Sequence, residues 1–188
     1  MQLCPVHCDT PILLVTEAER QTFFERHRSQ NEKLDAVLMM IGAAKTSLGG
    51  SENASARMEL ERQKGVEEKL LRELKFVIDH LQVVGPVASA DTAEIGTVIT
   101  IRRYEYDTGE LYARGNEQYH IGGYSSTDLR SSPPTMSYDS PLIRTLIGKP
   151  VDSMREPEEV LLTNGRRYFV ELMEISLPRP AFSLVKAA

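Results

Sequence analysis

The sequence predicts an α+β protein in which an antiparallel hairpin of two long helices precedes a small antiparallel-sheet domain with one short helix. Apolar residues recur at heptad spacing over residues 16–46 and again over residues 54–83, which is typical of paired helices. From Gly96 onward the spacing changes to an alternation of β-branched residues, with turn signals between the runs. That second pattern is typical of short strands.

The first helix is predicted over residues 16–46. Thr16 followed by Glu19 fits a capping box at its start. Its seam residues step alternately by four and three, which places them on one helical face. These residues are Phe23, His27, Gln30, Leu34, Val37, Ile41 and Ala44.

The second helix is predicted over residues 54–83, and Gly85-Pro86 is expected to end it. Its seam residues are Leu60, Gln63, Glu67, Leu70, Leu74, Val77 and Leu81. A Gly-Gly turn separates two seams of similar length, so residues 16–85 should fold back as a coiled-coil hairpin. At 1.5 Å rise per residue it would be about 45 Å long, with its tip at residues 47–56.

The sheet domain is expected over residues 86–178. GTVITIRRY predicts a first strand, YDTGELYARG a turn and a second strand, and YHIGG a short third strand. Gly122 and Gly123 predict a turn or a bulge, and a serine- and proline-rich loop follows them.

One short helix and one hairpin complete this domain. Ser140 as N-cap, Pro141 in the first turn and Gly148 as the stop predict a helix in SPLIRTLIG. Asn164-Gly165 predicts that EEVLLTNGRRYFVELMEI forms a closing hairpin. Residues 1–15 and 179–188 are expected to be a flexible extension and a loose tail.

Composition limits the classes of function. A net charge of −5 argues against broad, charge-driven binding to nucleic acid or membranes. No apolar run approaches the roughly 20 residues that a membrane helix needs. The first residues lack the basic region and cleavage site of a secretory signal, so a cytoplasmic protein is expected. No nucleophile elbow, phosphate-binding glycine loop or zinc-protease motif occurs in the chain.

The start of the chain contains both cysteines, Cys4 and Cys8, on either side of His7. One interpretation is a metal half-site, because thiolates and imidazole suit zinc. It would need a fourth ligand, and the other histidines lie far off in sequence. The alternative is a mobile terminus with two reduced thiols, and the sequence leaves both open.

The predicted tip, SLGGSENASA, contains a single acid, Glu52, beside Asn53. By itself Glu52 has a structural explanation, because acids are favoured in the first turn of a helix and Ser51 suits the N-cap. Asn53 would orient Glu52 or continue the cap.

The order of these elements resembles the bacterial Gre transcript cleavage factors. The likeness covers residues 16–178 and is strongest in SYDSPLIRTLIGKPVDS, residues 137–153, in which Ser-Pro opens a short helix and Ile-Gly-Lys ends it. GTVITIRR and the closing strands through ELMEI also resemble the family. The resemblance implies an FKBP-like sheet domain, although a prolyl isomerase pocket is not expected in a chain without tryptophan.

The resemblance also implies a partner and a mechanism. Gre factors place their globular domain on the rim of the secondary channel of RNA polymerase, and their coiled coil runs down that channel. Acids at the tip help to hold the second catalytic Mg²⁺ while the polymerase hydrolyses backtracked RNA, since paired metals bracket such a phosphoryl displacement. The chain itself would then not be an enzyme, would hold no cofactor stably and would meet nucleic acid only through the elongation complex.

This chain departs from the family at the tip. The family's Glu-Asn-Ala falls on Glu52, Asn53 and Ala54, whereas Gly49 stands at the first acidic position. One carboxylate holds a divalent ion more weakly than two, so the departure favours modulation of the channel over strong cleavage. A non-cleaving channel blocker, or a hairpin module unrelated to polymerase, remain the alternatives.

The resemblance places six residues of the Ser-Pro segment toward the polymerase rim. They are Tyr138, Asp139, Ser140, Pro141, Arg144 and Lys149. The two cations would meet an acidic surface, and the alternative for each is a merely solvated charge. Because the two seams pair with each other, a monomer is sufficient.

Overall fold

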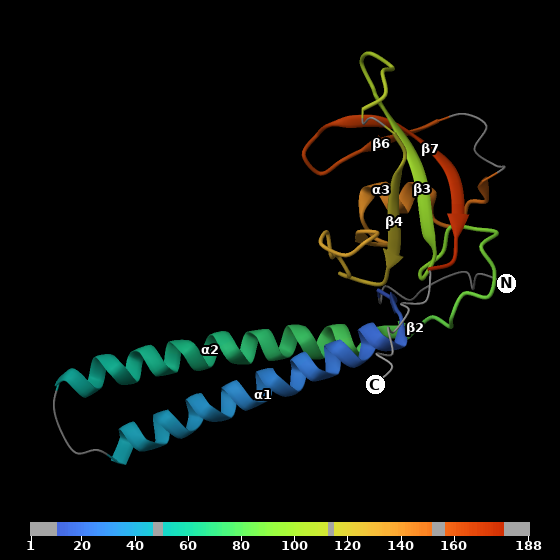
Figure 1. Ribbon diagram of the computed structural model, residues 1–188. Coiled ribbons are helices and arrows are strands. Elements are labelled where there is room, and N and C mark those ends of the chain that lie inside the picture. The colour runs from blue at the N-terminus through green and yellow to red at the C-terminus, as the bar shows by residue number, and fades with distance from the viewer. Residues whose placement is uncertain (1–10, 47–50, 113–114, 152–156, 179–188) are drawn as a thin grey trace, which may run out of the picture. The chain divides into compact units, whose positions relative to one another are not determined.

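The computed structural model describes residues 11–46, 51–112, 115–151 and 157–178 (Figure 1). For residues 46 and 51–53 it describes the backbone alone. The contacts divide the chain into two compact units. One runs to Val83 and contains both long helices, whereas the other begins at Val84 and also includes Leu14–Thr16. Two long helices dominate the first unit and a five-stranded sheet the second, so the α+β class is confirmed.

The helical unit is a hairpin of α1, Glu17–Thr46, and α2, Ser51–Asp79. Figure 1 shows the two helices side by side and antiparallel. The seam predicted for α1 is confirmed, because every one of its seven residues is buried or half-buried. Phe23, Val37 and Ile41 are the most deeply buried of its apolar side chains.

The seam of α2 differs from the predicted one in its middle. Leu70 is 42% exposed, whereas Leu71 is half-buried. A straight helix has about 3.6 residues per turn, so a stripe that starts at Leu60 drifts from the strict heptad and reaches position 71 rather than 70. The half-buried Lys64 and Ile78 follow the same drift.

A polar contact between Gln30 of α1 and Glu67 of α2 joins the two helices of the hairpin. Gln30, only 7% exposed, donates from Nε2 to the Glu67 carboxylate and, at 3.5 Å, to the Glu67 carbonyl oxygen. Both residues were predicted as polar members of the seams. The hydrogen bond explains how a buried amide is tolerated there.

Helix α2 ends earlier than Gly85-Pro86 predicts. Its last residue is Asp79, and Leu81–Val83 form β2, which pairs in a two-stranded sheet with β1, Leu13–Val15. Residues 13–15 were expected in a flexible extension, and Leu81 in the helical seam. Neither strand is longer than three residues, so neither shows a recognisable alternation in sequence.

The second unit is built on a five-stranded sheet in the order β5-β4-β3-β7-β6. These strands are β3 Val98–Glu105, β4 Glu117–Gly122, β5 Thr135–Ser137, β6 Glu158–Leu161 and β7 Arg167–Ser176. Strand β5 runs parallel to β4, so the sheet is mixed and the expectation of a purely antiparallel sheet was wrong. The long loop after Gly123 returns the chain before it pairs, which is what a parallel neighbour requires.

Of the strand predicted in YDTGELYARG, the described residues form only an isolated bridge, between Tyr104 and Leu111. The partner of β3 is instead β4, which begins before the predicted YHIGG strand and pairs Val98 with His120. The turn after β3 passes through Gly109, which has a φ of +68° and donates its N–H to the Glu105 carbonyl at 2.8 Å.

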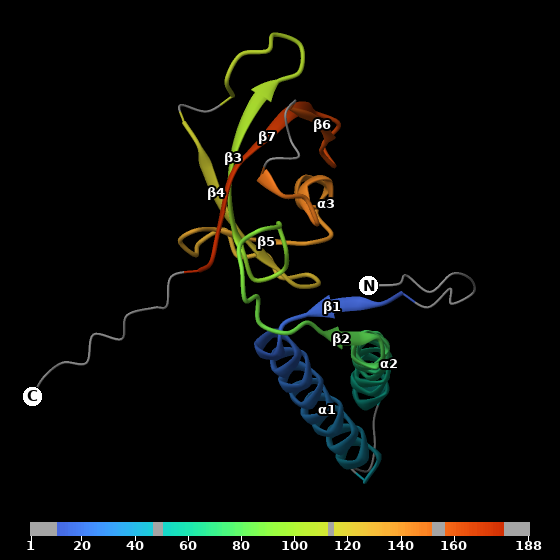
Figure 2. The same cartoon turned by 90° about the vertical axis from the view of Figure 1, so that its right-hand side faces the viewer.

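The core of this unit lies between the sheet and α3, Pro141–Leu146 (Figure 2). Its fully buried side chains are Ile99, Ile101, Ile121, Ile143, Leu146 and Val170. The β3–β7 register shifts between Thr100 and Ile101, which leaves Met173 of β7 without a partner on β3, as in a β-bulge.

The hairpin predicted at Asn164-Gly165 is confirmed by the pairing of β6 with β7. Gly165 has a φ of +79° and donates its N–H to the Leu162 carbonyl at 2.9 Å. The Arg166 N–H donates to Asn164 Oδ1 at 3.0 Å. The turn is therefore a three-residue loop with glycine in the left-handed region, one of the common hairpin forms. None of the described helices has the length and apolar content that crossing a membrane requires.

Candidate functional site

The Ser-Pro segment folds as predicted into the short helix α3. Ser140 occupies the N-cap position, Pro141 lies in the first turn, and Leu142, Ile143 and Leu146 are buried on the inner face. Gly148 has a φ of +79° and donates its N–H to the Ala93 carbonyl at 2.8 Å, which ends the helix and ties it to residues before the sheet.

The Ser140 side chain does not cap this helix. Its Oγ is buried and has no hydrogen-bond partner, the one such side-chain atom among the described residues. The hydroxyl therefore does not lie at the surface, where a rim-binding residue would present it. Pro141, whose ring fixes the backbone angle, suffices to start a helix without this cap.

The residues before α3 are held from inside their own unit. The Tyr138 hydroxyl accepts a hydrogen bond from the Leu14 N–H at 3.3 Å, and the Tyr138 N–H donates to the Gly122 carbonyl at 3.0 Å. The Ser137 hydroxyl donates to the Gly123 carbonyl at 2.7 Å and also contacts the exposed carboxylate of Asp139. Tyr138 is thus a structural anchor as well as a candidate contact.

The two cations of the segment differ. Lys149 forms an ion pair through Nζ with both carboxylate oxygens of Glu158 on β6. Arg144 is exposed on the outer side of α3. A partner would therefore meet Arg144 directly, whereas Lys149 already has a counter-ion.

The tip residues belong to the helical unit, whereas Tyr138 to Lys149 belong to the sheet unit. Glu52 and Asn53 lie in the first turn of α2, and their side chains are outside what the structure describes. Gly49 and the metal candidates Cys4, His7 and Cys8 lie outside the described residues altogether. In the described part of the chain, no three histidine, cysteine or acidic side chains gather to hold a metal ion.

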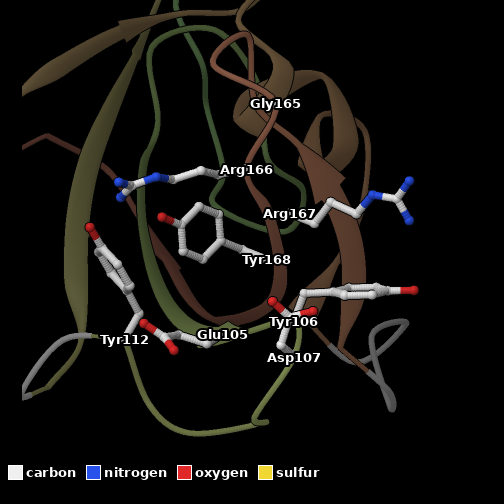
Figure 3. A pocket seen from close by; sticks show the side chains of 8 residues that line it. All are labelled: Glu105, Tyr106, Asp107, Tyr112, Gly165, Arg166, Arg167 and Tyr168. Carbon is white, nitrogen blue, oxygen red and sulfur yellow. The ribbon is translucent and has the colours of Figure 1, made fainter.

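A second candidate site, which was not predicted, lies at one end of the sheet (Figure 3). It is a hollow of about 650 Å³ between the end of β3 and the β6–β7 turn, hereafter the tyrosine hollow. Arg166, in the β6–β7 turn, and Arg167, the first residue of β7, line one side of it. Glu105, the last residue of β3, and Asp107 line the other side, with Tyr112 and Tyr168 between.

An ion pair supports the aromatic side of the hollow. The Arg103 guanidinium donates two hydrogen bonds to the Glu117 carboxylate, at 2.8 and 2.6 Å, and lies 4.7 Å from the ring centre of Tyr112. Tyr112 in turn meets Tyr168 edge to face at 4.8 Å. This stack fixes the orientation of both rings.

The same network changes two pKa values. Burial lowers the pKa of Arg103, but the hydrogen bonds and charge of Glu117 outweigh it, so the net shift is upward. Burial and then the hydrogen bond to Glu117, at 2.6 Å from the hydroxyl, raise the pKa of Tyr119 to about 12. Both shifts stabilise the form present at neutral pH.

A sequence signal for the hollow exists in retrospect. The tripeptide Arg-Arg-Tyr occurs twice, at residues 102–104 and 166–168. Antiparallel pairing of β3 with β7 brings the two copies to the same end of the sheet, where Glu105 lies opposite Tyr168. Only the second copy lines the hollow, while Arg103 of the first copy contacts the Tyr112 ring, so the pairing register is needed to connect the repeat with the site.

The fold and these sites define an α+β protein with a helical-hairpin unit and a mixed-sheet unit. Comparison with protein-family models gave no match, and comparison with curated proteins also gave none. Among solved structures, the chain is similar to the GreA factor homolog 1 (Gfh1) protein of Thermus thermophilus and to Gfh1 of Thermus aquaticus.

For the Thermus thermophilus protein the identity is 14% and the TM-score 0.37, over 88% of this chain and 99% of that one. For the Thermus aquaticus protein the identity is 14% and the TM-score 0.38, over 88% of this chain and 98% of that one. A further structure, described as the transcription factor Gfh1, gives 16% and 0.39, over 88% and 98%. Similarity of this size supports no inference about fold or function by itself.

Proposed function

We propose that this chain is an RNA polymerase-binding transcription elongation factor of the Gre class, which inserts its helical hairpin into the secondary channel and modulates elongating and backtracked complexes. The observation that carries the proposal is the order of two elements. A hairpin of 30- and 29-residue helices precedes a sheet unit in which the Gre-like segment SPLIRTLIGK forms the short helix α3 and its glycine stop.

The length of the hairpin and its closed seam support this proposal. At 1.5 Å per residue its helices extend about 45 Å. Buried apolar residues of α1 and the hydrogen bonds between Gln30 and Glu67 hold the two helices together along their seam. Four residues, 47–50, join the helices, so the acid nearest the turn is Glu52 at the start of α2.

The tip supports modulation more than cleavage. Glu52 is the single acid between Asp35 and Glu59, so the tip offers a Mg²⁺ ion one carboxylate. A hard divalent cation is held by several oxygen ligands. The polymerase would therefore have to supply the remaining ligands, and cleavage through Glu52 would be weak.

The sheet unit would bind the rim of the channel. An FKBP-like arrangement remains part of this proposal. Exposed Arg144 and Asp139 are the residues of the Ser-Pro segment best placed to meet a partner. Binding through Lys149 would compete with its ion pair to Glu158, so it should add less.

The test is an assay on stalled, backtracked elongation complexes that carry labelled RNA. The chain is expected to bind the complex and to slow nucleotide addition, with little Mg²⁺-dependent shortening of the RNA. Any shortening should vanish in Glu52→Ala and persist in Glu61→Ala, a control that removes an exposed acid further along α2.

Each outcome separates the alternatives. Strong shortening that depends on Glu52 would replace modulation by cleavage as the main role. Failure to capture polymerase by the purified chain would refute the proposal and leave a hairpin module that binds another protein. Arg144→Ala should weaken capture, whereas exchange of the exposed Arg130, on the loop before β5, should not.

A further inference from the structure

The tyrosine hollow separates opposite charges onto two sides. Arg166 and Arg167 come from the β6–β7 turn and the first residue of β7, whereas Glu105 and Asp107 come from the last residue of β3 and the turn after it. In Figure 3 the Arg166 side chain extends past Tyr168 toward Tyr112, while the acids lie below the rings. A ligand of the hollow therefore meets a cation at one end and carboxylates at the other.

Part of this charge has no counter-ion inside the protein. Arg167 pairs with Glu159 at 3.4 Å. Within the described ranges, no ion pair involves Arg166, Glu105 or Asp107. The neighbouring hydroxyl of Tyr168, and to a smaller extent Tyr112, raise the pKa of Arg166, so it stays charged. The Glu105 carboxylate accepts one long hydrogen bond, from the Thr108 hydroxyl at 3.4 Å. One guanidinium and two carboxylates thus have no counter-ion that would compete with a ligand.

The aromatic side offers a stacking surface. Tyr168 is almost fully buried and forms the base, and Tyr112 is 41% exposed above it. The Arg103–Glu117 ion pair holds the Tyr112 ring in place from behind. A ring that is already oriented binds a planar ligand without losing further conformational freedom.

These features match one ligand chemistry. Arginine suits a phosphate, and an exposed tyrosine suits a planar base, since every base has a π face. A carboxylate accepts hydrogen bonds only, so it selects a base edge that carries adjacent N–H donors. Guanine presents such an edge through its ring N–H and its amino group. A hollow of about 650 Å³ is of the size found for small-molecule sites.

We infer that the tyrosine hollow binds a guanine nucleotide, with the base stacked on Tyr112, its donor edge on Glu105 and Asp107, and its phosphate on Arg166. The inference is independent of the proposed role at polymerase. A tract of single-stranded nucleic acid fits less well, because the acidic side repels a continuous phosphate backbone and the chain carries a net charge of −5.

The experiment is calorimetric titration of the full chain with GMP, and then with probes that each lack one recognised group. IMP lacks the amino group of guanine, guanosine lacks the phosphate, and UMP has a different base. GMP should bind in the millimolar range or tighter, and IMP and guanosine should each bind about tenfold more weakly, the cost of one charge-assisted hydrogen bond.

Two variants connect the probes to the residues. Arg166→Gln should weaken GMP about tenfold and leave guanosine unchanged. Glu105→Gln should weaken GMP and reduce its preference over IMP, because an amide no longer accepts two hydrogen bonds from one edge. The matched controls are Glu110→Gln, in the same turn but outside the lining, and Arg130→Gln on a distant loop.

Several results would overturn the inference. UMP or inorganic phosphate binding as tightly as GMP would show that base and edge are not recognised. An equal loss of GMP binding in the control variants would place the site elsewhere. No heat at about 5 mM GMP, with unfolding midpoints equal across the variants, would show that the hollow does not bind a nucleotide. None of these outcomes bears on capture of polymerase, so the two proposals fail separately.

Discussion

Gly122 is the position at which the packing of the sheet unit permits no side chain. It is the last residue of β4 and lies opposite Ser137 of β5. A Cβ atom built there would lie 2.8 Å from the Ser126 Cβ, 2.8 Å from the Thr135 Cγ2 and 3.0 Å from the Ser126 carbonyl oxygen. Gly122→Ala must therefore push β5 or the preceding loop away from β4.

The expected magnitude is the balance of two opposing effects. An added methyl group in a packed interior costs about 1–3 kcal/mol. Alanine restricts the unfolded chain more than glycine and returns about 0.4–1 kcal/mol. Gly122→Ala should therefore destabilise the sheet unit by about 1 kcal/mol, with an upper bound of about 2.6 kcal/mol.

The control is a glycine with open space around it. Gly65 lies inside α2, and a Cβ there meets no atom within 4 Å. Gly65→Ala should stabilise the hairpin by about 0.5–1 kcal/mol, since glycine is a poor helix former. The two substitutions are chemically identical and are expected to have opposite signs.

Urea unfolding followed by two signals separates the units. All seven tyrosines lie at or beyond Tyr104, in the sheet unit, so tyrosine fluorescence reports that unit. Far-UV helical ellipticity reports chiefly the hairpin. A fluorescence midpoint for Gly122→Ala at or above that of the wild type would refute the packing argument. So would a loss of helical stability in Gly65→Ala.

Three further changes test the sheet unit. Ser140→Ala should leave stability unchanged or raise it, although an N-cap serine normally contributes about 1 kcal/mol, because its buried hydroxyl has no partner to lose; a midpoint lowered by that amount would contradict this. Glu117→Gln should cost about 1–3 kcal/mol in urea unfolding, since it leaves Arg103 largely buried without its counter-charge; a silent variant would show that solvent screens the pair. The raised pKa of Tyr119, about 12, predicts a contribution to stability that is complete below pH 10 and is lost as pH rises from 10 to 12. Tyr119→Phe should remove that pH dependence, and an ordinary tyrosine titration in the folded wild type would argue against it.

Local patterns were sufficient for the elements that contain strong repeats or stop signals. The α1 seam, the Pro141 helix with its Gly148 stop and the Asn164-Gly165 hairpin all form where the sequence predicts them. Each of these elements is specified by residues that lie only a few positions apart in the sequence. The short strands β1 and β2 were missed because three residues carry no periodicity of their own.

The candidate sites divide in the same way. The Ser-Pro segment could be proposed from the sequence because its residues are adjacent in the chain, and its role as a site stays a prediction. The tyrosine hollow was not found, because Glu105 and Tyr168 become neighbours only through the register of β3 and β7. The roles within the Ser-Pro segment also needed the fold, since Lys149 is matched by Glu158 and the Ser140 hydroxyl is buried.

By itself the sequence determined two kinds of feature: the helical hairpin with one acid at its turn, and the α+β class of the whole. Both follow from the periodicity of apolar residues and from the residue types at turns, which are patterns over a few residues. Tertiary structure decided that β5 runs parallel to β4, that the stripe of α2 reaches Leu71, and that the end of β3 and the start of β7 line one hollow. Those outcomes depend on pairing between distant residues, whose free energy no local pattern contains.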